Sequence, residues 1–190
     1  WYNINDRMQV GGRSGYEYFE KDQNYLYTIA QFFPRMCVYN DVTGWQNKQF
    51  LGRGEFTLPF GDYVVNITVP SDHIVAGTGE CQNYASILTT DQKKRLELAR
   101  KSDSPIIIVT QAEAEAAEKD KSTKTKTWTF KATNVRDFAF ATSRKFIWDA
   151  QNMPVNGKNV LCMSYYPKEG NPLWERYSTK LVAHTIKTYS

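Results

Sequence analysis

The sequence contains few of the side chains that most often bind metals or form disulfides. Its 190 residues include two histidines and three cysteines, without a C-x-x-C or H-E-x-x-H pattern. Cys37, Cys81 and Cys162 lie among apolar neighbours, so we expect buried, unpaired thiols. His73 and His184 are isolated in the sequence. We therefore predict no metal ligands and no catalytic residues in this chain.

Long apolar runs and a strong charge excess are also missing. No stretch approaches the roughly 20 apolar residues that a membrane-spanning helix needs, so we expect no membrane-spanning segment. The formal net charge of +4 does not by itself indicate a nucleic-acid or membrane-surface partner. Charged residues make up 23% of the chain, which is typical of a globular protein.

Aromatic residues are abundant, at 14% of the chain, and they favour strands and large packed cores. The clearest strand is 62–69, where apolar side chains alternate with others. Further strands are predicted at 25–39 (broken at Pro34), 50–58, 74–79, 106–109, 127–132, 138–142, 145–148 and 159–166. We expect eight side chains to be largely buried: Phe56, Tyr63, Val65, Ile67, Trp128, Phe130, Phe138 and Phe140.

Helix signals interrupt the strand pattern in two places. Capping boxes, in which a threonine is followed three residues later by Gln or Glu, begin at Thr89 and Thr110. Asn171-Pro172 then predicts a helix start, with Asn171 as the cap and proline at the first helical position. The fold class expected is mainly β: an antiparallel β-sandwich with a helical insertion near 89–121 and a C-terminal helix over 172–190.

The order of several segments points to one family. These segments are Ala30–Met36, Tyr39–Asp41, Gly44-Trp45, Gly52–Phe56, Phe60–Tyr63, Ile67–Pro70, Ala76–Glu80, Trp128–Ala132 and Val135–Ala141. Together they resemble the N-terminal domain of the aminopeptidase N-like zinc metallopeptidases, the gluzincin family. The resemblance covers nearly the whole chain apart from 89–121, although no single motif is diagnostic.

The resemblance implies a saddle-like β domain that precedes a thermolysin-like catalytic domain with a zinc-binding H-E-x-x-H. Residues 1–170 are then the N-terminal β domain, incomplete at its start, and 171–190 a helix leading into a catalytic domain absent from this sequence. The parent is expected to be a zinc aminopeptidase, whereas this chain alone is expected to hold no cofactor and to be inactive. The expected partners are the catalytic domain and a peptide substrate, and the expected location is periplasmic or secreted.

One substrate-binding residue follows from the same resemblance. The family commonly supplies from this domain a glutamine or glutamate that holds the free amino group of the peptide, and Gln31 is the matching position. A glutamine side-chain oxygen can accept a hydrogen bond from an ammonium group. The alternative is that Gln31 is an ordinary polar residue on a strand face.

Two other classes of function remain open from the sequence. A free-standing β-sandwich interaction or carbohydrate-binding module would use exposed tryptophans, for which Trp45, Trp128 and Trp148 are candidates. An RNA-binding module is suggested faintly by Arg136–Phe140, which resembles an aromatic strand motif that stacks bases. Asp137 in that segment would oppose phosphate, so we expect no nucleic-acid partner.

Overall fold

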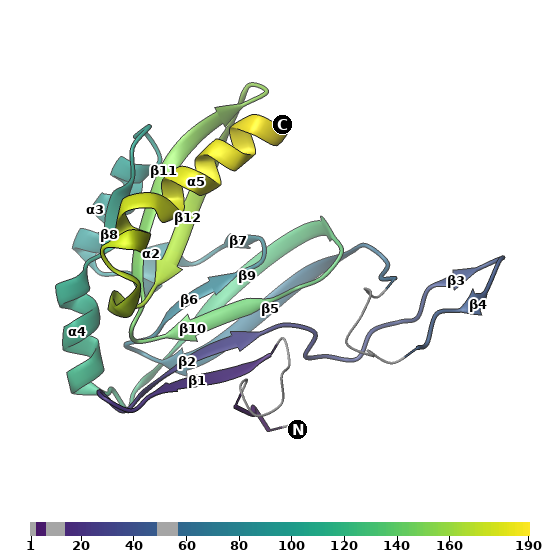
Figure 1. The fold of residues 1–190 in the computed structure, drawn as a ribbon, viewed down its shortest axis with the longest axis horizontal. Helices are drawn as coiled ribbons and strands as arrows, with labels where there is room; N and C mark the ends of the chain where they lie inside the picture. The colour runs from purple at the N-terminus through teal and green to yellow at the C-terminus, as the bar shows by residue number, and fades with distance from the viewer. Residues whose placement is uncertain (1–2, 7–13, 49–56) are drawn as a thin grey trace.

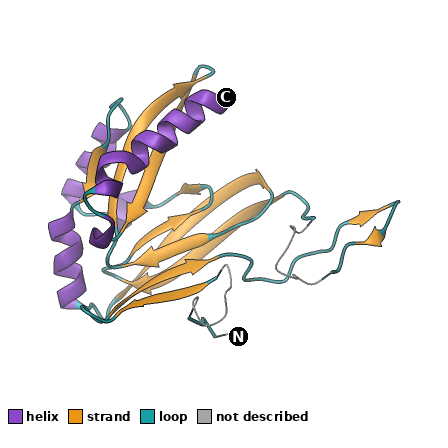
Figure 2. Cartoon of the chain, in the orientation of Figure 1, coloured by secondary structure: helices purple, strands orange, loops and turns teal. Residues whose placement is uncertain are grey.

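Antiparallel strands build most of the fold in a computed structural model that describes residues 3–6, 14–48 and 57–190. Strands account for 40% of the chain and helices for 25%, so the mainly β prediction is confirmed. Figure 1 shows the strands in stacked layers, with the helices gathered on one side, and Figure 2 separates the two kinds of element by colour.

Two sheets form the sandwich. The four-stranded sheet has the order β1 (Gly15–Phe19), β2 (Asn24–Ile29), β10 (Phe140–Ser143) and β6 (Ile74–Gly77). The long-strand sheet has the order β5 (Gly61–Pro70), β9 (Thr125–Val135) and β7 (Glu80–Cys81). The two sheets approach so closely that a Cβ atom on Gly77 would lie 3.2 Å from the Phe130 ring.

A third sheet lies beneath the helices and completes the layers. This helix-covered sheet has the order β12 (Lys158–Tyr166), β11 (Ile147–Val155) and β8 (Ile106–Val109). The helices are α2 (Tyr84–Ile87), α3 (Thr90–Ala99), α4 (Gln111–Asp120) and α5 (Leu173–Tyr189), with a 3₁₀ turn η1 (Lys168–Gly170) before α5. Val75, Trp128 and Trp148 come from the three sheets and meet in one core with Leu96 of α3.

A small hairpin projects from the sandwich. It consists of β3 (Tyr39–Asn40) and β4 (Gly44–Trp45), and Figure 1 shows it as an arm that extends away from the layers. Asn40 forms the turn, because its Oδ1 accepts hydrogen bonds from the backbone N–H groups of Val42 and Thr43 at 3.1 and 2.8 Å. We refer to this hairpin as the β3–β4 arm.

The helices α3 and α4 begin where the sequence predicts. Both capping boxes form: Thr89 with Gln92, and Thr110 with Glu113, each accept a hydrogen bond from the other residue's backbone N–H. The helical insertion is therefore confirmed. It is not a separate module, because β8 pairs with β11 in the helix-covered sheet.

The start of the last helix differs by one position. Pro172 is the N-cap residue of α5, whereas we predicted Asn171 as the cap. The 3₁₀ turn η1 immediately before Asn171 shifts the entry of the chain into the helix. Asn171 still provides a partner for one backbone N–H group of the first turn, because its Oδ1 accepts a hydrogen bond from the N–H of Glu175 at 3.3 Å.

The burial predictions are confirmed in part. Ile67, Trp128, Phe130 and Phe138 are buried. Tyr63, Val65 and Phe140 are only half-buried. Phe56 and most of the predicted strand 50–58 lie outside the described residues, and Thr57 and Leu58 are not in a strand.

Two further predictions need correction. All three cysteines are free, but only Cys162 is buried; Cys81 is half-buried and Cys37 is exposed. Cys37 is exposed because β2 ends at Ile29 and the chain then runs as a loop toward the β3–β4 arm, not as a strand to Tyr39.

None of the described helices is long and apolar enough to span a membrane.

A buried lysine joins the sandwich to the helical side. Lys145 lies in the connection between β10 and β11, and its side chain is fully buried. Its Nζ binds Asp22 from the β1–β2 turn, Glu118 of α4 at 3.0 Å and Glu169 of η1 at 3.0 Å. Burial alone would lower the pKa of Lys145, but the hydrogen bonds to these carboxylates raise it, so the ammonium stays charged.

A buried histidine lies on the face of the four-stranded sheet. His73 is 6% exposed, and its Nδ1 lies 3.1 Å from Thr142 Oγ1. The Thr142 hydroxyl donates to the carbonyl of Ile74, so His73 Nδ1–H is the donor in the first bond. Burial first, and then the nearby Arg144, lower the pKa of His73 to about 4.

We predict that Lys145→Met destabilises the fold by about 3–5 kcal/mol, because three carboxylates lose the cation on which they converge. The free energy of unfolding in urea measures the effect. Lys94→Met is the matched control, since the Lys94 side chain is 72% exposed and its one ion pair among the described residues is with Asp91 at 3.6 Å; a change above about 0.5 kcal/mol there is not expected. Equal effects of the two substitutions would contradict the role given to Lys145.

We predict a loss of about 3 kcal/mol of stability from His73 between pH 7 and pH 4. The folded pKa of about 4 lies below the unfolded value of 6.5, so the contribution is complete above pH 6.5 and is lost as the pH falls toward 4. Urea unfolding at both pH values measures it. His73→Gln keeps an amide donor but cannot titrate, so its stability should fall less over the same range; an equal fall in both proteins would contradict the prediction.

Candidate functional site

Gln31 lies at a sharp turn just after β2. Its φ is +52°, a left-handed conformation that is uncommon for a residue with a side chain. Ser14 fixes the residue before it, because Ser14 Oγ accepts a hydrogen bond from the N–H of Ala30 at 2.6 Å and donates to the Ala30 carbonyl. Backbone strain of this kind is concentrated at functional sites, so the turn marks Gln31 as a candidate site residue.

Aromatic packing holds the residues that follow. The ring of Phe32 packs edge-on against Phe140 of β10 at 5.4 Å, and that of Phe33 against Tyr63 of β5 at 5.9 Å. These two rings anchor the loop on both sheets of the sandwich. The Gln31 side chain remains exposed and has no hydrogen bond to any described residue.

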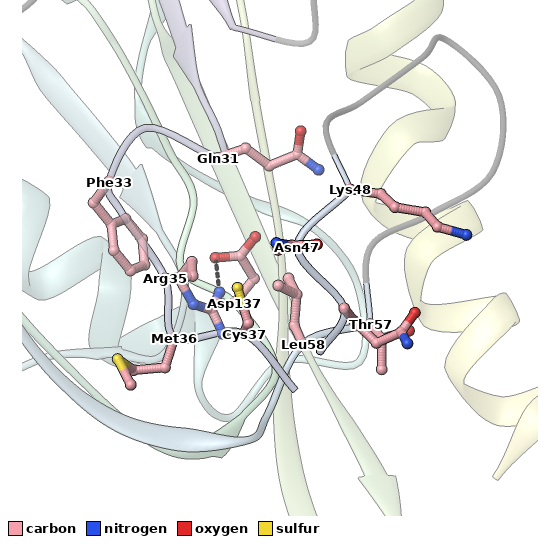
Figure 3. A pocket seen from close by; sticks show the side chains of 11 residues that line it. Gln31, Phe33, Arg35, Met36, Cys37, Asn47, Lys48, Thr57, Leu58 and Asp137 are labelled. Carbon is pink, nitrogen blue, oxygen red and sulfur yellow. Dashed lines mark hydrogen bonds and ion pairs between the residues drawn. The ribbon is translucent and has the colours of Figure 1, made fainter. Parts of the chain in front are cut away.

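A cavity of about 220 Å³ opens between this loop and the base of the β3–β4 arm. Its lining residues are Gln31, Phe33, Arg35, Met36, Cys37, Gln46, Asn47, Lys48, Thr57, Leu58 and Asp137. Figure 3 shows Gln31 above the Arg35–Asp137 pair, with the Lys48 side chain extending away from both. We call this space the Gln31 cavity.

Arg35 ties together the three segments that surround the cavity. Its Nη1 donates to Asp137 Oδ1 at 2.6 Å, and its Nη2 donates to the carbonyls of Arg136 at 2.6 Å and Pro59 at 3.1 Å. The guanidinium also lies 5.3 Å from the Phe33 ring and 5.8 Å from the Tyr63 ring. The side chain of Arg35 is 15% exposed, whereas its hydrogen bonds to the two backbone carbonyls lie at the surface.

Two acceptor groups remain available in the Gln31 cavity. Asp137 Oδ1 accepts from Arg35 and from the backbone N–H of Phe138, whereas Oδ2 has no hydrogen bond to a described residue. Figure 3 shows this second oxygen on the side of Gln31. The amide oxygen of Gln31 and the free oxygen of Asp137 can therefore both accept hydrogen bonds from an ammonium group.

The sequence identified only part of this arrangement. Gln31 was predicted, and the structure places it at a cavity, but Arg35 and Asp137 were not singled out as site residues. Both occur in segments that carried the family resemblance, at 30–36 and 135–141. No spacing rule links two residues that are a hundred positions apart, so only the fold could bring them together.

The other sequence candidates are placed differently. Trp128 and Trp148 are fully buried and so offer no surface for a sugar, while Trp45 on the β3–β4 arm is exposed and packs against Tyr39. Phe138 is also fully buried, so its ring is not available for base stacking. Within the described residues, no group of three or more His, Cys, Asp or Glu side chains could hold a metal ion.

A second surface is formed by the outer side of α5. Toward the helix-covered sheet, α5 buries Thr179, whose hydroxyl contacts Asp149 and, at 2.8 Å, Ser164. Toward solvent it presents a stripe of large apolar side chains. The exposed fractions along the stripe are 61% for Leu173, 43% for Tyr177 and 58% for Leu181.

Comparison of the chain with protein-family models, with curated proteins and with solved structures finds no match.

We predict that Arg35→Lys destabilises the fold by about 1–3 kcal/mol, because one ammonium cannot replace the forked guanidinium on three acceptors. Backbone hydrogen exchange should also become faster in residues 31–38. Arg95→Lys is the matched control: Arg95 makes a single ion pair, with Glu113 at 2.6 Å. If the two substitutions have equal effects on unfolding and on exchange in 31–38, Arg35 does not organise the cavity.

Proposed function

We propose that this chain is the non-catalytic N-terminal domain of a zinc-dependent aminopeptidase. In this role it forms one wall of the active site and holds the free amino group of the peptide substrate. The zinc and the groups that bind it belong to the catalytic domain of the parent. The metal would polarise the scissile carbonyl and activate water there, while this chain supplies position.

The observation that carries the proposal is the placement of Gln31. A strained turn presents its side-chain amide, without a hydrogen-bond partner among the described residues, at a cavity that also exposes Asp137 Oδ2. An ammonium group bound between these oxygens would fix the first peptide bond at one distance from the anchor. Such positioning determines which bond is cleaved, and so favours removal of a single amino-terminal residue.

The outer surface of α5 supports the same assignment. An exposed apolar stripe on a helix indicates a surface that is covered in the complete protein. In the proposed parent, the catalytic domain covers Leu173, Tyr177 and Leu181. The polar contacts of Thr179 on the inner side hold the helix in the orientation that presents this stripe.

We predict that Gln31→Ala in the full-length parent lowers kcat/KM for an alanyl anilide by about ten- to hundredfold, which corresponds to the roughly 1.5–3 kcal/mol of a hydrogen bond to a charged group. An N-acetylated substrate should be affected far less, because it carries no ammonium group. Steady-state kinetics with both substrates measure the difference.

Gln46→Ala is the matched control, since Gln46 lines the same cavity but its amide donates to Thr43 Oγ1 and to the Gly44 carbonyl. Its kcat/KM should stay within about twofold of the unmodified enzyme. If the Gln31 variant also stays within that range, with folding and zinc content intact, Gln31 is not the anchor.

A further inference from the structure

The two sheets of the sandwich are unequal in width. A row of side chains crosses the inner face of the four-stranded sheet from Val75 through Thr142 and Tyr27 to Tyr16. Val75 is fully buried and Thr142 is 5% exposed, whereas Tyr27 and Tyr16 are half-buried. Cover from the long-strand sheet therefore decreases across the row, and the inner face of β2 and β1 extends beyond it.

The long-strand sheet ends at β5, and this edge carries little protection. Among the described residues β9 is the sole strand paired with β5, over the range 61–70. No lysine or arginine occurs in β5, and Pro70 is its last residue. Lysine, proline and β-bulges commonly block natural edge strands. In β5 the proline is the last residue and a register shift lies between Gly61 and Tyr63, so 63–69 is the part of the edge open to pairing.

A cavity of about 370 Å³ lies along this open edge. Ile67 and Val69 of β5 line one side, and Tyr25, Tyr27 and Phe140 of the four-stranded sheet line the other. No residue of β9 contributes to the lining, so the cavity lies on the free side of β5. A strand paired with β5 would place alternate side chains in it.

The edge cavity is linked to the candidate site by shared lining residues. A middle cavity of about 380 Å³ shares Ile4 and Ile29 with the edge cavity and Gln31 with the Gln31 cavity. The contact between Phe33 and Tyr63 places the Gln31 loop near the first residues of β5. The last residues of β5, Val69 and Pro70, lie at the far end of this path.

The cavity along the edge favours apolar side chains. The charges beside the cavity are already matched, because Arg144 lies 3.3 Å from Asp72. Side chains entering the cavity should therefore be apolar and uncharged.

We propose that the free edge of β5 binds an extended peptide, with its amino end at Gln31 and its chain running parallel to β5 toward Pro70. Alternate apolar side chains of this peptide lie against Tyr25 and Tyr27. This inference rests on the proposed function and names its substrate class: peptides of about six or more residues, the length needed at roughly 3.3 Å per residue to follow β5.

The test is peptide binding to the full-length protein after zinc removal by a chelator, so that the peptide is not cleaved. The probe is an eight-residue peptide with valine at alternate positions and a carboxyl-terminal fluorophore, measured by anisotropy. It should bind at least about tenfold more tightly than a labelled dipeptide. On binding, hydrogen exchange should slow at alternate amides of β5. Equal affinity for the two peptides, or unchanged exchange in β5, would overturn the proposal.

Two lysine substitutions locate the binding path. Tyr25→Lys places a charge in the edge cavity. It should lower the affinity for the eight-residue peptide at least about tenfold and leave the affinity for the dipeptide unchanged. Tyr39→Lys is the control, because Tyr39 is an exposed tyrosine in a strand of the β3–β4 arm and does not line the cavity. Equal effects of both substitutions would contradict the edge site. Circular dichroism confirms that each variant is folded.

Acetylation of the peptide separates this inference from the proposed function. Loss of affinity on acetylation, with no effect of peptide length or of Tyr25→Lys, would support the anchor at Gln31 and overturn the edge site. A length effect that is lost in Tyr25→Lys but is unchanged by acetylation or by Gln31→Ala would support edge binding. It would contradict both the anchor and the position given to the amino end.

Discussion

The arrangement of the layers depends on one buried cation. Lys145 is the point at which the β1–β2 turn, α4 and η1 converge, and each supplies a carboxylate to the same ammonium group. Apolar packing can tolerate sliding between layers, whereas a cation with three fixed acceptors specifies both distance and direction. The helix-covered sheet therefore has a defined position relative to the sandwich, and so does α5, which packs on that sheet.

The candidate site is built on the same principle at smaller scale. Arg35 connects the Gln31 loop to the residues before β5 and to the connection between β9 and β10. Gln31 makes no such connection to a described residue, which leaves its amide available. A residue that anchors a substrate needs a rigidly held backbone and a polar side chain that is free to bind. Arg35 holds the loop, and the amide of Gln31 is the free group.

Local signals in the sequence predicted the parts of the fold that depend on local chemistry. The capping boxes at Thr89 and Thr110 formed as expected, and the alternation in 62–69 marked β5, because both patterns act through adjacent backbone groups. The exposed Cys37 was mispredicted, since its environment depends on where the loop after β2 runs. For the site, Gln31 came from family resemblance, while its pairing with Arg35 and Asp137 required contacts between distant segments.

The inner side of α5 couples the helix to the register of the sheet beneath it. Thr179 is buried there, and its hydroxyl contacts Asp149 of β11 and Ser164 of β12. Asp149 and Ser164 are directly paired across the two strands. A shift in the pairing of β11 with β12 would separate these two side chains, and Thr179 could not then contact both.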